Sequence, residues 1–278
     1  MKRIRKYWSF ILACVCFAFV LIYAPDGHGA VLKGQIAHHK MIYPIVRITA
    51  GEAAGSGTII YSKKNEAGVF ETFVLTNHHV VAQCINVKEE WDSTKKKDVK
   101  KETLDVVYVE VFQYKHLSTP IGTLRVEAEI VGYNADEDMA LIKLASEDKQ
   151  PFVAELYPRG KDDEIHVMDE SVAVGCSLAY PPLPSSGEIT RKNMILNSFP
   201  YHMSSSQIIY GNSGGAMFDE TGRLVGIPSM VAAIGWSSVV THMGFFIPIE
   251  RVYEWWDKIG FDAEKGLAKK EIEEEKEK

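Results

Sequence analysis

Short stretches rich in valine, isoleucine, tyrosine and phenylalanine recur along the chain after Ala30, and they constrain its fold more than any other feature. Glycine, proline, asparagine and aspartate separate them, as around YPIVRIT, GSGTIIYS, LDVVYVEVFQY and MALIKL. Apolar runs of this length bounded by turn residues are typical of β-strands. Because no long helical periods come between them, the pattern predicts an all-β domain built as barrels or as a sandwich.

The two ends of the chain depart from this pattern. Residues 1–30 begin with a basic cluster and continue with an apolar run at 7–24. This arrangement predicts either a cleaved secretory signal or a membrane anchor, and both place the domain in the periplasm or outside the cell. Near the other end, PIERVYEWWDKIGF has the apolar spacing of a helix that stops at Gly260. The remaining residues, 259–278, are expected to form a charged, exposed tail.

Charge and cysteine content narrow the classes of partner. The formal net charge of −6 gives no overall attraction to nucleic acid, so none is expected as a partner. A lysine-rich stretch at 86–103 also carries glutamate and aspartate, and we interpret it as a solvated loop between strands rather than a site for an anionic surface. Beyond the apolar run, Cys84 and Cys176 are interpreted as two buried thiols, with one disulfide as the alternative.

Three motifs offer the side chains of a nucleophilic hydrolase. Ser213 lies within GNSGG, His79 follows an apolar stretch in TNHHVV, and Asp138 begins DMALIK. A serine hydroxyl is a poor nucleophile until a base takes its proton, and a third group must orient that base. The chain order His, Asp, Ser is one of three orders in which this triad occurs.

In this order the motifs resemble those of the trypsin-like serine peptidases, and more narrowly those of the bacterial HtrA-type protease domain. The resemblance rests on GSG at 55–57, TNHHVV at 76–81, DMALIK at 138–143 and GNSGG at 211–215, and it covers roughly residues 40–258. It implies a chymotrypsin-like fold of two six-stranded antiparallel β-barrels, followed by a C-terminal helix.

The resemblance also implies a domain organisation. A protease domain is expected over 38–258, with barrel one at about 38–150 and barrel two at about 165–250. HtrA-type proteins usually carry a PDZ domain after the protease, and the sequence ends too soon for one. We therefore expect the protease domain to act alone or through its N-terminal anchor.

Roles follow residue by residue from the match to the family motifs. It assigns His79 as the base, Asp138 as the group that orients it, and Ser213 as the nucleophile. The backbone N–H groups of Gly211 and Ser213 are expected to form the oxyanion hole, with glycine at 211 allowing the loop to turn. His78 is then a structural neighbour of the site.

Other polar residues receive simpler interpretations. Asp136 is interpreted as a turn residue. His38 and His39 lack a further ligand at suitable spacing, so no metal is expected, and the chemistry needs no cofactor. Digestive relatives have aspartate directly before the serine, where this chain has Asn212. Activation by insertion of a new N-terminus is therefore not expected.

The residues before the serine bear on substrate preference. Gln207 stands six positions before it, where trypsin-like enzymes hold an acidic residue, so cleavage after lysine or arginine is disfavoured. Ile208, Ile209 and Phe246 predict an apolar pocket for small or medium side chains. His242 could face an acidic group instead, but it is interpreted as a strand residue.

These motifs predict an exported serine endopeptidase that acts on protein or peptide substrates, including damaged or misfolded ones in extracytoplasmic quality control. The alternative is a protease-like binding or scaffold protein that has lost turnover, because a fold alone does not determine function. A third interpretation, in which GNSGG is only a structural turn, leaves the histidine and aspartate motifs unexplained.

Overall fold

The computed structural model describes residues 32–94, 96–234 and 238–267 of the 278-residue chain. The chain divides into two compact units, 1–30 and 31–278, and the described residues belong to the second. The predicted signal or anchor segment lies outside them. Within the described part of the chain, no helix combines the length and the apolar character needed to cross a membrane.

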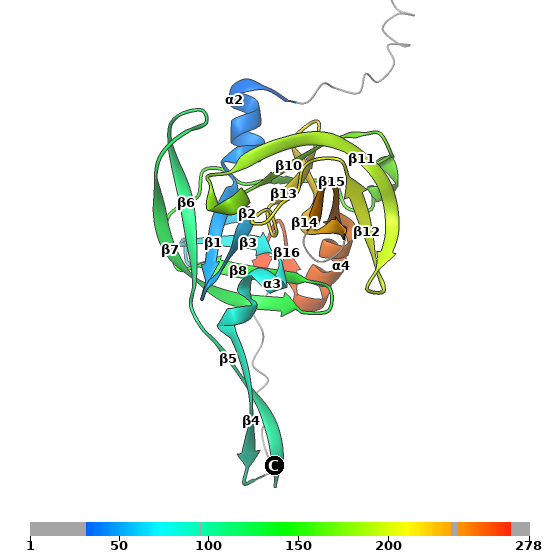
Figure 1. The fold of residues 1–278 in the computed structure, drawn as a ribbon. Coiled ribbons are helices and arrows are strands. Elements are labelled where there is room, and N and C mark those ends of the chain that lie inside the picture. The colour runs from blue at the N-terminus through cyan, green and yellow to red at the C-terminus, as the bar shows by residue number, and fades with distance from the viewer. Residues whose placement is uncertain (1–31, 95, 235–237, 268–278) are drawn as a thin grey trace, which may run out of the picture. The chain divides into compact units, whose positions relative to one another are not determined.

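Six antiparallel strands close into the first barrel (Figure 1). In spatial order they are β1 (Ile45–Ala50), β2 (Ala53–Lys64), β3 (Phe70–Thr76), β8 (Met139–Leu144), β7 (Thr119–Asn134) and β6 (Val107–His116). Branched aliphatic side chains such as Val46, Ile48 and Ile142 point inward and are fully buried. This core explains why the sequence of barrel one reads as short runs of valine and isoleucine.

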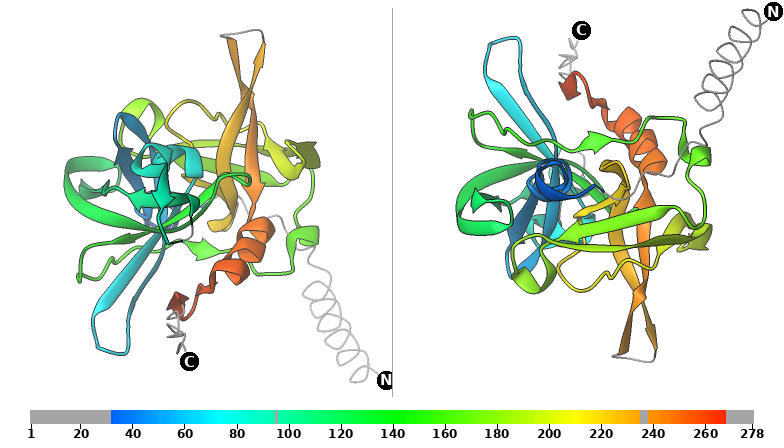
Figure 2. Two further views of the ribbon diagram at one scale, coloured as in Figure 1. Left: turned by 90° about the horizontal axis from the view of Figure 1, so that it is seen from below. Right: turned by 90° about the horizontal axis from the view of Figure 1, so that it is seen from above.

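The second barrel lies beside the first and is also six-stranded (Figure 2). Its ring runs β13 (Ala216–Asp219), β10 (Glu170–Gly175), β11 (Leu183–Leu196), β12 (Phe199–Ser204), β15 (Ser238–Pro248) and β14 (Arg223–Ile234), and β13 pairs with β14 to close it. A short strand, β9 (Glu155–Leu156), adds to β14 in parallel. The prediction of two six-stranded antiparallel barrels is therefore confirmed.

Short helical turns connect the strands. They are α2 (Gly34–Ala37), η1 (His38–Ile42), α3 (His78–Val81), η2 (Ala82–Cys84), η3 (Asp162–Glu164) and η4 (Ser177–Ala179). The longest helix among the described residues, α4 (Ile249–Ile259), follows β15 and ends at Gly260 as predicted. It buries Val252, Trp255 and Trp256 against the barrels, in agreement with its apolar spacing.

Residues after α4 differ from the expected exposed tail. Two short strands, β16 (Phe261–Asp262) and β17 (Gly266–Leu267), pair into a hairpin. Phe261 is only 4% exposed, and its ring meets those of Phe73 and Trp256 at centroid distances of 5.2 and 4.8 Å. Phe261, together with a hydrogen bond from Lys63 to the Glu264 carbonyl, holds this charged segment against the domain. Residues 268–278 lie outside the described residues.

The charged stretch at 86–103 is the second difference, because the prediction of a loop there is wrong. It forms a two-stranded antiparallel ribbon of β4 (Ile85–Asp92) and β5 (Lys97–Leu104), which extends away from barrel one (Figure 1). Opposite charges face each other across the ribbon: Glu89 pairs with Lys100, and Lys101 makes an ion pair with Glu90 at 3.3 Å. Such cross-strand pairs stabilise a ribbon that buries little. The stretch is solvated, as predicted.

Candidate active site

Strand pairing in barrel one brings His79 and Asp138 together. β3 and β8 are neighbours with Thr76 opposite Ala140, so the residues that follow β3 and precede β8 emerge at the same end of the barrel. The Nδ1 atom of His79 lies 2.9 Å from each carboxylate oxygen of Asp138, and the His79 backbone N–H donates to Oδ1 at 3.0 Å. A carboxylate only accepts, so Nδ1 carries the proton and Nε2 is the basic nitrogen of the neutral ring.

Asp138 is held from three sides. Its backbone has a φ of 56°, a left-handed conformation that aspartate tolerates better than most residues. The Asn77 side-chain amide donates to its carbonyl at 2.8 Å, and the Ser229 hydroxyl donates to Oδ2 at 2.6 Å. Burial alone would raise the pKa of Asp138, but the hydrogen bonds and charge of His79 and the Ser229 hydrogen bond outweigh it and lower the pKa. The carboxylate is therefore ionised near neutral pH.

Ser229 also connects this pair to Ser213. The Ser213 hydroxyl donates to the Ser229 carbonyl at 3.4 Å, while the Ser229 side chain is bonded to Asp138. Among the described residues no hydrogen bond joins Ser213 to His79. Catalytic hydrogen bonds are often long or misaligned without substrate. Sequence reasoning did not find Ser229, because a single serine on β14 carries no motif.

The loop that carries Ser213, residues 210–215, is called the nucleophile loop, and it presents the Gly211 N–H as a free donor. Gly211 has a φ of 95°, which favours glycine, and a Cβ there would lie 2.5 Å from the Cys176 carbonyl oxygen. The preceding carbonyl, that of Tyr210, accepts from the Leu178 N–H at 2.9 Å. In a planar trans peptide the N–H points opposite to the C=O, so this bond turns the Gly211 N–H away from Leu178.

The same reasoning applies to Ser213. The Asn212 carbonyl accepts from the Gly215 N–H at 2.9 Å, which orients the Ser213 N–H in the opposite direction. Within the described ranges, neither the Gly211 N–H nor the Ser213 N–H donates to a protein acceptor. Two oriented donors next to a serine hydroxyl are the arrangement that stabilises an oxyanion.

Ser56 on β2 ties the nucleophile loop to barrel one. Its N–H donates to the Ser213 carbonyl at 2.8 Å, and its hydroxyl donates to the Gly211 carbonyl at 2.6 Å while accepting from the Cys176 N–H at 2.7 Å. Burial raises the pKa of the Cys176 thiol to about 12, so it is not a nucleophile near neutral pH. Cys176 and Cys84 are both free and buried, as interpreted from the sequence.

The four residues expected to line the substrate pocket do not share one environment. Ile208 and Phe246 are buried, at 2% and 0% exposed, and belong to the core of barrel two. Gly244 explains the position of Ile208, because a Cβ there would lie 2.4 Å from Ile208 Cδ1 and would displace it. Gln207 is exposed and Ile209 is half-buried, so only these two reach solvent.

The neighbours of the triad residues lie where the sequence suggested. Asp136 is an exposed residue of the turn between β7 and β8. The ring of His78 stacks on Tyr133 at a centroid distance of 5.3 Å. Among the described residues, Asp138 is hydrogen-bonded to His79 and not to His78. Burial lowers the pKa of His78; the charge of Asp138 opposes this shift and that of His79 adds to it. His78 is thus a packing residue beside the site.

A buried ion pair under the triad turn was not predicted. Glu137, which directly precedes Asp138, is 9% exposed and accepts from the Arg251 guanidinium at 3.2 Å. Arg251 lies on α4 and also donates to the Pro200 carbonyl at 3.0 Å. The C-terminal helix therefore supports the turn that carries Asp138. Its single arginine has no sequence signature.

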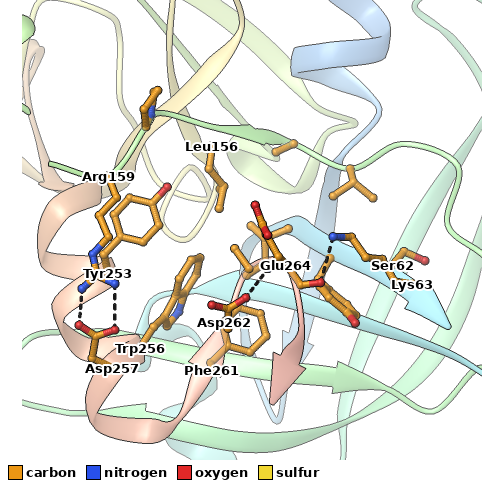
Figure 3. A pocket seen from close by; sticks show the side chains of 16 residues that line it. Ser62, Lys63, Leu156, Arg159, Tyr253, Trp256, Asp257, Phe261, Asp262 and Glu264 are labelled. Atoms are coloured by element: carbon orange, nitrogen blue, oxygen red, sulfur yellow. Dashed lines mark hydrogen bonds and ion pairs between the residues drawn. The ribbon is translucent and has the colours of Figure 1, made fainter. Parts of the chain in front are cut away.

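A pocket of about 560 Å³ beside α4 contains none of these residues (Figure 3). Aromatic side chains including Tyr61, Trp256 and Phe261 line it, and Arg159 donates to Asp257 at 3.0 Å at its edge. The residues of the expected triad therefore lie outside this pocket.

The sequence matches the family model of the trypsin-like peptidase domain over residues 55–227, which is more than half of the chain. The chain belongs to the trypsin-like peptidase family. The match spans all three motifs of the expected triad, and the resemblance inferred from them is confirmed.

Several proteins similar to this chain are named as proteases. The chain is 26% identical over 201 residues to the periplasmic pH-dependent serine endoprotease DegQ of Escherichia coli strain K12, covering 71% of this chain and 35% of DegQ. It is 26% identical over 202 residues to the magnetosome formation protease MamE of Paramagnetospirillum magneticum, with 71% and 22% covered. The serine protease Do-like HtrA of Lactococcus lactis is 25% identical over 222 residues, with 75% and 45% covered. The chain spans less than half the length of each.

A solved structure, "HtrA-type protease AlgW with tripeptide", has a similar fold. It aligns with a TM-score of 0.59 at 21% identity and covers 81% of this chain and 64% of that chain. At this identity the likeness concerns the fold, and it agrees with the double barrel described above.

Proposed function

We propose that this protein is a serine endopeptidase that hydrolyses peptide bonds of protein substrates through an acyl-enzyme intermediate. One observation carries the proposal: the His79 ring is bonded to the Asp138 carboxylate at 2.9 Å, beside a serine loop that offers two free backbone donors. Family membership supports it, because the trypsin-like peptidase model spans all of these residues.

In the proposed reaction, His79 Nε2 takes the proton of the Ser213 hydroxyl as the oxygen attacks the peptide carbonyl carbon. The Gly211 and Ser213 N–H groups stabilise the resulting oxyanion, and the loss of one such donor costs about 3–4 kcal/mol of transition-state stabilisation. The tetrahedral intermediate then breaks its C–N bond, and His79 returns the proton to the leaving amine. Water repeats the sequence on the ester and frees the serine.

Asp138 stabilises the charged ring in this scheme. Its lowered pKa keeps it ionised, so it faces the imidazolium with a full negative charge and holds Nδ1 as the protonated nitrogen. Ser229 holds the carboxylate in turn, through a 2.6 Å hydrogen bond.

We also propose an extracytoplasmic role in protein quality control. The relative DegQ is named a periplasmic endoprotease, and residues 7–24 form the apolar run of a signal or anchor. Cell fractionation of the full chain, with detection before and after carbonate extraction, distinguishes export and anchoring from retention in the cytoplasm.

One observation favours the alternative of a protease-like protein without turnover. The Ser213 hydroxyl donates to the Ser229 carbonyl instead of to His79, so the base is not yet joined to the nucleophile. The serine hydroxyl must turn from the Ser229 carbonyl toward His79 before reaction. Failure to make that rotation would leave the double barrel as a binding module.

Reaction with a fluorophosphonate probe separates the two possibilities, because only an activated serine is phosphonylated. We expect the full chain to be labelled at Ser213 and to degrade unfolded casein. The variants Ser213→Ala and His79→Ala should do neither while unfolding at the same urea concentration as the wild type. A folded wild-type protein that is not labelled would overturn the endopeptidase proposal.

A further inference from the structure

Three large apolar side chains stand exposed next to the nucleophile loop. Leu178 is 63% exposed, Tyr180 is 61% exposed and Tyr210 is 73% exposed. The first two belong to the connection between β10 and β11, and the third directly precedes Gly211. Exposed apolar side chains that gather at one place mark interaction sites more often than isolated ones do.

The connection that carries two of them is strained and firmly held. Leu178 and Ala179 have φ values of 50° and 62°, in the left-handed region that side chains with a Cβ rarely adopt. Hydrogen bonds oppose the strain: the Leu178 N–H donates to Tyr210 at 2.9 Å, and the Ala179 N–H donates to Cys176 at 3.0 Å. The Arg47 guanidinium donates to the Ala179 carbonyl. Strain that the surroundings maintain in this way is typical of functional sites.

This apolar group lies on one flank of the oxyanion donors. A Cβ at Gly211 would lie 2.9 Å from the Leu178 nitrogen, so the two backbones are in contact. On the other flank, β14 contacts the loop through the Ser229 carbonyl, which accepts from Ser213, and through Pro228, which accepts from the Gly214 N–H at 3.1 Å. A peptide attacked by Ser213 therefore has one part over β14 and the other over Leu178.

The leaving part belongs on the Leu178 side. His79, which protonates the leaving amine in the proposed function, is carried by barrel one. Arg47 of the same barrel holds the connection through the Ala179 carbonyl, whereas β14 reaches barrel one at Asp138, on the Nδ1 side of the His79 ring and not at the Nε2 that donates the proton. Arg47 is paired with Glu110, which balances its charge and leaves the flank apolar.

We propose that Leu178, Tyr180 and Tyr210 bind apolar side chains of the substrate directly after the scissile bond. The proposal rests on the proposed function and adds a substrate class to it: polypeptides with leucine-like residues on the leaving side. Such residues are buried in folded proteins, so the surface selects unfolded segments.

Competition between an added amine and water for the acyl-enzyme tests binding on the leaving side alone. The full chain is acylated with the p-nitrophenyl ester of a blocked small apolar amino acid, and leucinamide or glycinamide is added. The amine nitrogen attacks the ester carbonyl, forms the new amide bond and frees the Ser213 hydroxyl, in competition with water. We expect leucinamide to capture the acyl group about five to ten times more efficiently than glycinamide, as partial burial of one leucine side chain implies.

Two variants and one matched control make the test specific. Leu178→Asn keeps the backbone donor and tolerates the left-handed conformation, and Tyr210→Ser removes a second side chain; each should lower the preference to about twofold or less. Met168→Asn is the control, because Met168 is 74% exposed with a φ of 79° and lies in the turn before β10. It should keep the wild-type preference.

The readout is a ratio of two products from one acyl-enzyme, so a general change in rate does not affect it. A wild-type ratio near one, or a ratio unchanged in both variants, would overturn the proposed surface while leaving the endopeptidase intact. Absence of fluorophosphonate labelling in the folded wild type would instead overturn the endopeptidase, and this proposal with it.

Discussion

Removal of one hydroxyl, in Ser56→Ala, should affect both the stability of the protein and the proposed oxyanion hole. Ser56 is fully buried, and its hydroxyl joins the Cys176 N–H at 2.7 Å to the Gly211 carbonyl at 2.6 Å. Alanine leaves both backbone groups without this partner. Within the described part of the chain, this hydroxyl makes the single side-chain hydrogen bond between β2 and the loop that carries the two free donors.

The magnitude follows from the surroundings of each group. Cys176 is buried, so its unpaired N–H costs about 1–3 kcal/mol of unfolding free energy. Gly211 is half-buried, so water recovers part of the lost bond to its carbonyl and adds little to this sum. Without Ser56, the Gly211–Asn212 peptide keeps the bond from the Asn212 N–H to the Ile209 carbonyl but loses the one at its own carbonyl. This peptide joins the two peptides that carry the free donors, so we expect a loss of about 10- to 100-fold in labelling rate, below the full loss of one donor.

Two assays measure these effects on one sample. Urea unfolding followed by tryptophan fluorescence gives the free energy, and the second-order rate of fluorophosphonate labelling gives the reactivity of Ser213. Ser62→Ala is the control, because Ser62 lies on the same strand and accepts a buried backbone N–H, that of Gln150, at 2.9 Å. The control should lose comparable stability and keep the wild-type labelling rate. If Ser56→Ala is destabilised but labelled as fast as the control, the loop does not depend on Ser56 for its orientation.

Two further predictions concern charges outside the triad. Arg251→Met should lower the unfolding free energy by about 2–4 kcal/mol, because it removes the guanidinium from the buried Glu137 carboxylate and leaves it with the exposed Lys258 at 3.5 Å. The double variant with Glu137→Gln should recover part of the loss in urea unfolding. Burial raises the pKa of Asp162, but the hydrogen bond and charge of His202 and the charge of Lys192 outweigh it and lower the pKa. The stability that ionised Asp162 contributes is therefore present above about pH 4, which is the pKa of aspartate in the unfolded chain. It is lost as the pH falls through the lower pKa of the native state. Urea midpoints of wild type and Asp162→Asn should differ at pH 6 and converge near pH 2.

The members of the proposed triad could be chosen from the sequence because each lies in a local motif next to a predicted strand. His79 follows β3 and Asp138 precedes β8, and the pairing of these two strands brings the two side chains together. Short apolar runs and turn residues predicted an all-β domain of barrels or a sandwich, and the family resemblance carried by the motifs implied the two six-stranded barrels. The roles of these residues remain a proposal that labelling will test.

What could not be predicted depends on contacts between distant residues of ordinary type. No pattern in the sequence indicates that the hydroxyl of Ser56 donates a hydrogen bond to Gly211, 155 positions away. Likewise, none indicates that the hydroxyl of Ser229 donates to Asp138. The direction of Ile208 is set by the missing side chain of Gly244, which lies on another strand, and this is why an expected pocket residue is buried. Long-range steric and hydrogen-bond complementarity of this kind leaves no periodic pattern.

The β4–β5 ribbon leads to a last prediction. No residue between Asn86 and Thr103 contributes to the buried core of the described chain, so replacing them with an Asn-Gly turn should change the unfolding free energy by less than about 0.5 kcal/mol. The Ile85–Leu104 pair remains to close the shortened ribbon. We expect cooperative urea unfolding and a wild-type labelling rate.

One contact makes the opposite result informative. The Tyr133 hydroxyl donates to Glu102 on β5 at 2.5 Å, and the same ring stacks on His78, the residue before His79. If the ribbon deletion slows labelling, Tyr133→Phe should slow it by the same factor, since it removes only the hydroxyl that meets the ribbon. A deletion that slows labelling without an effect of Tyr133→Phe would contradict this route. The ribbon would then act on the site through its own exposed surface, where Trp91 is 64% exposed.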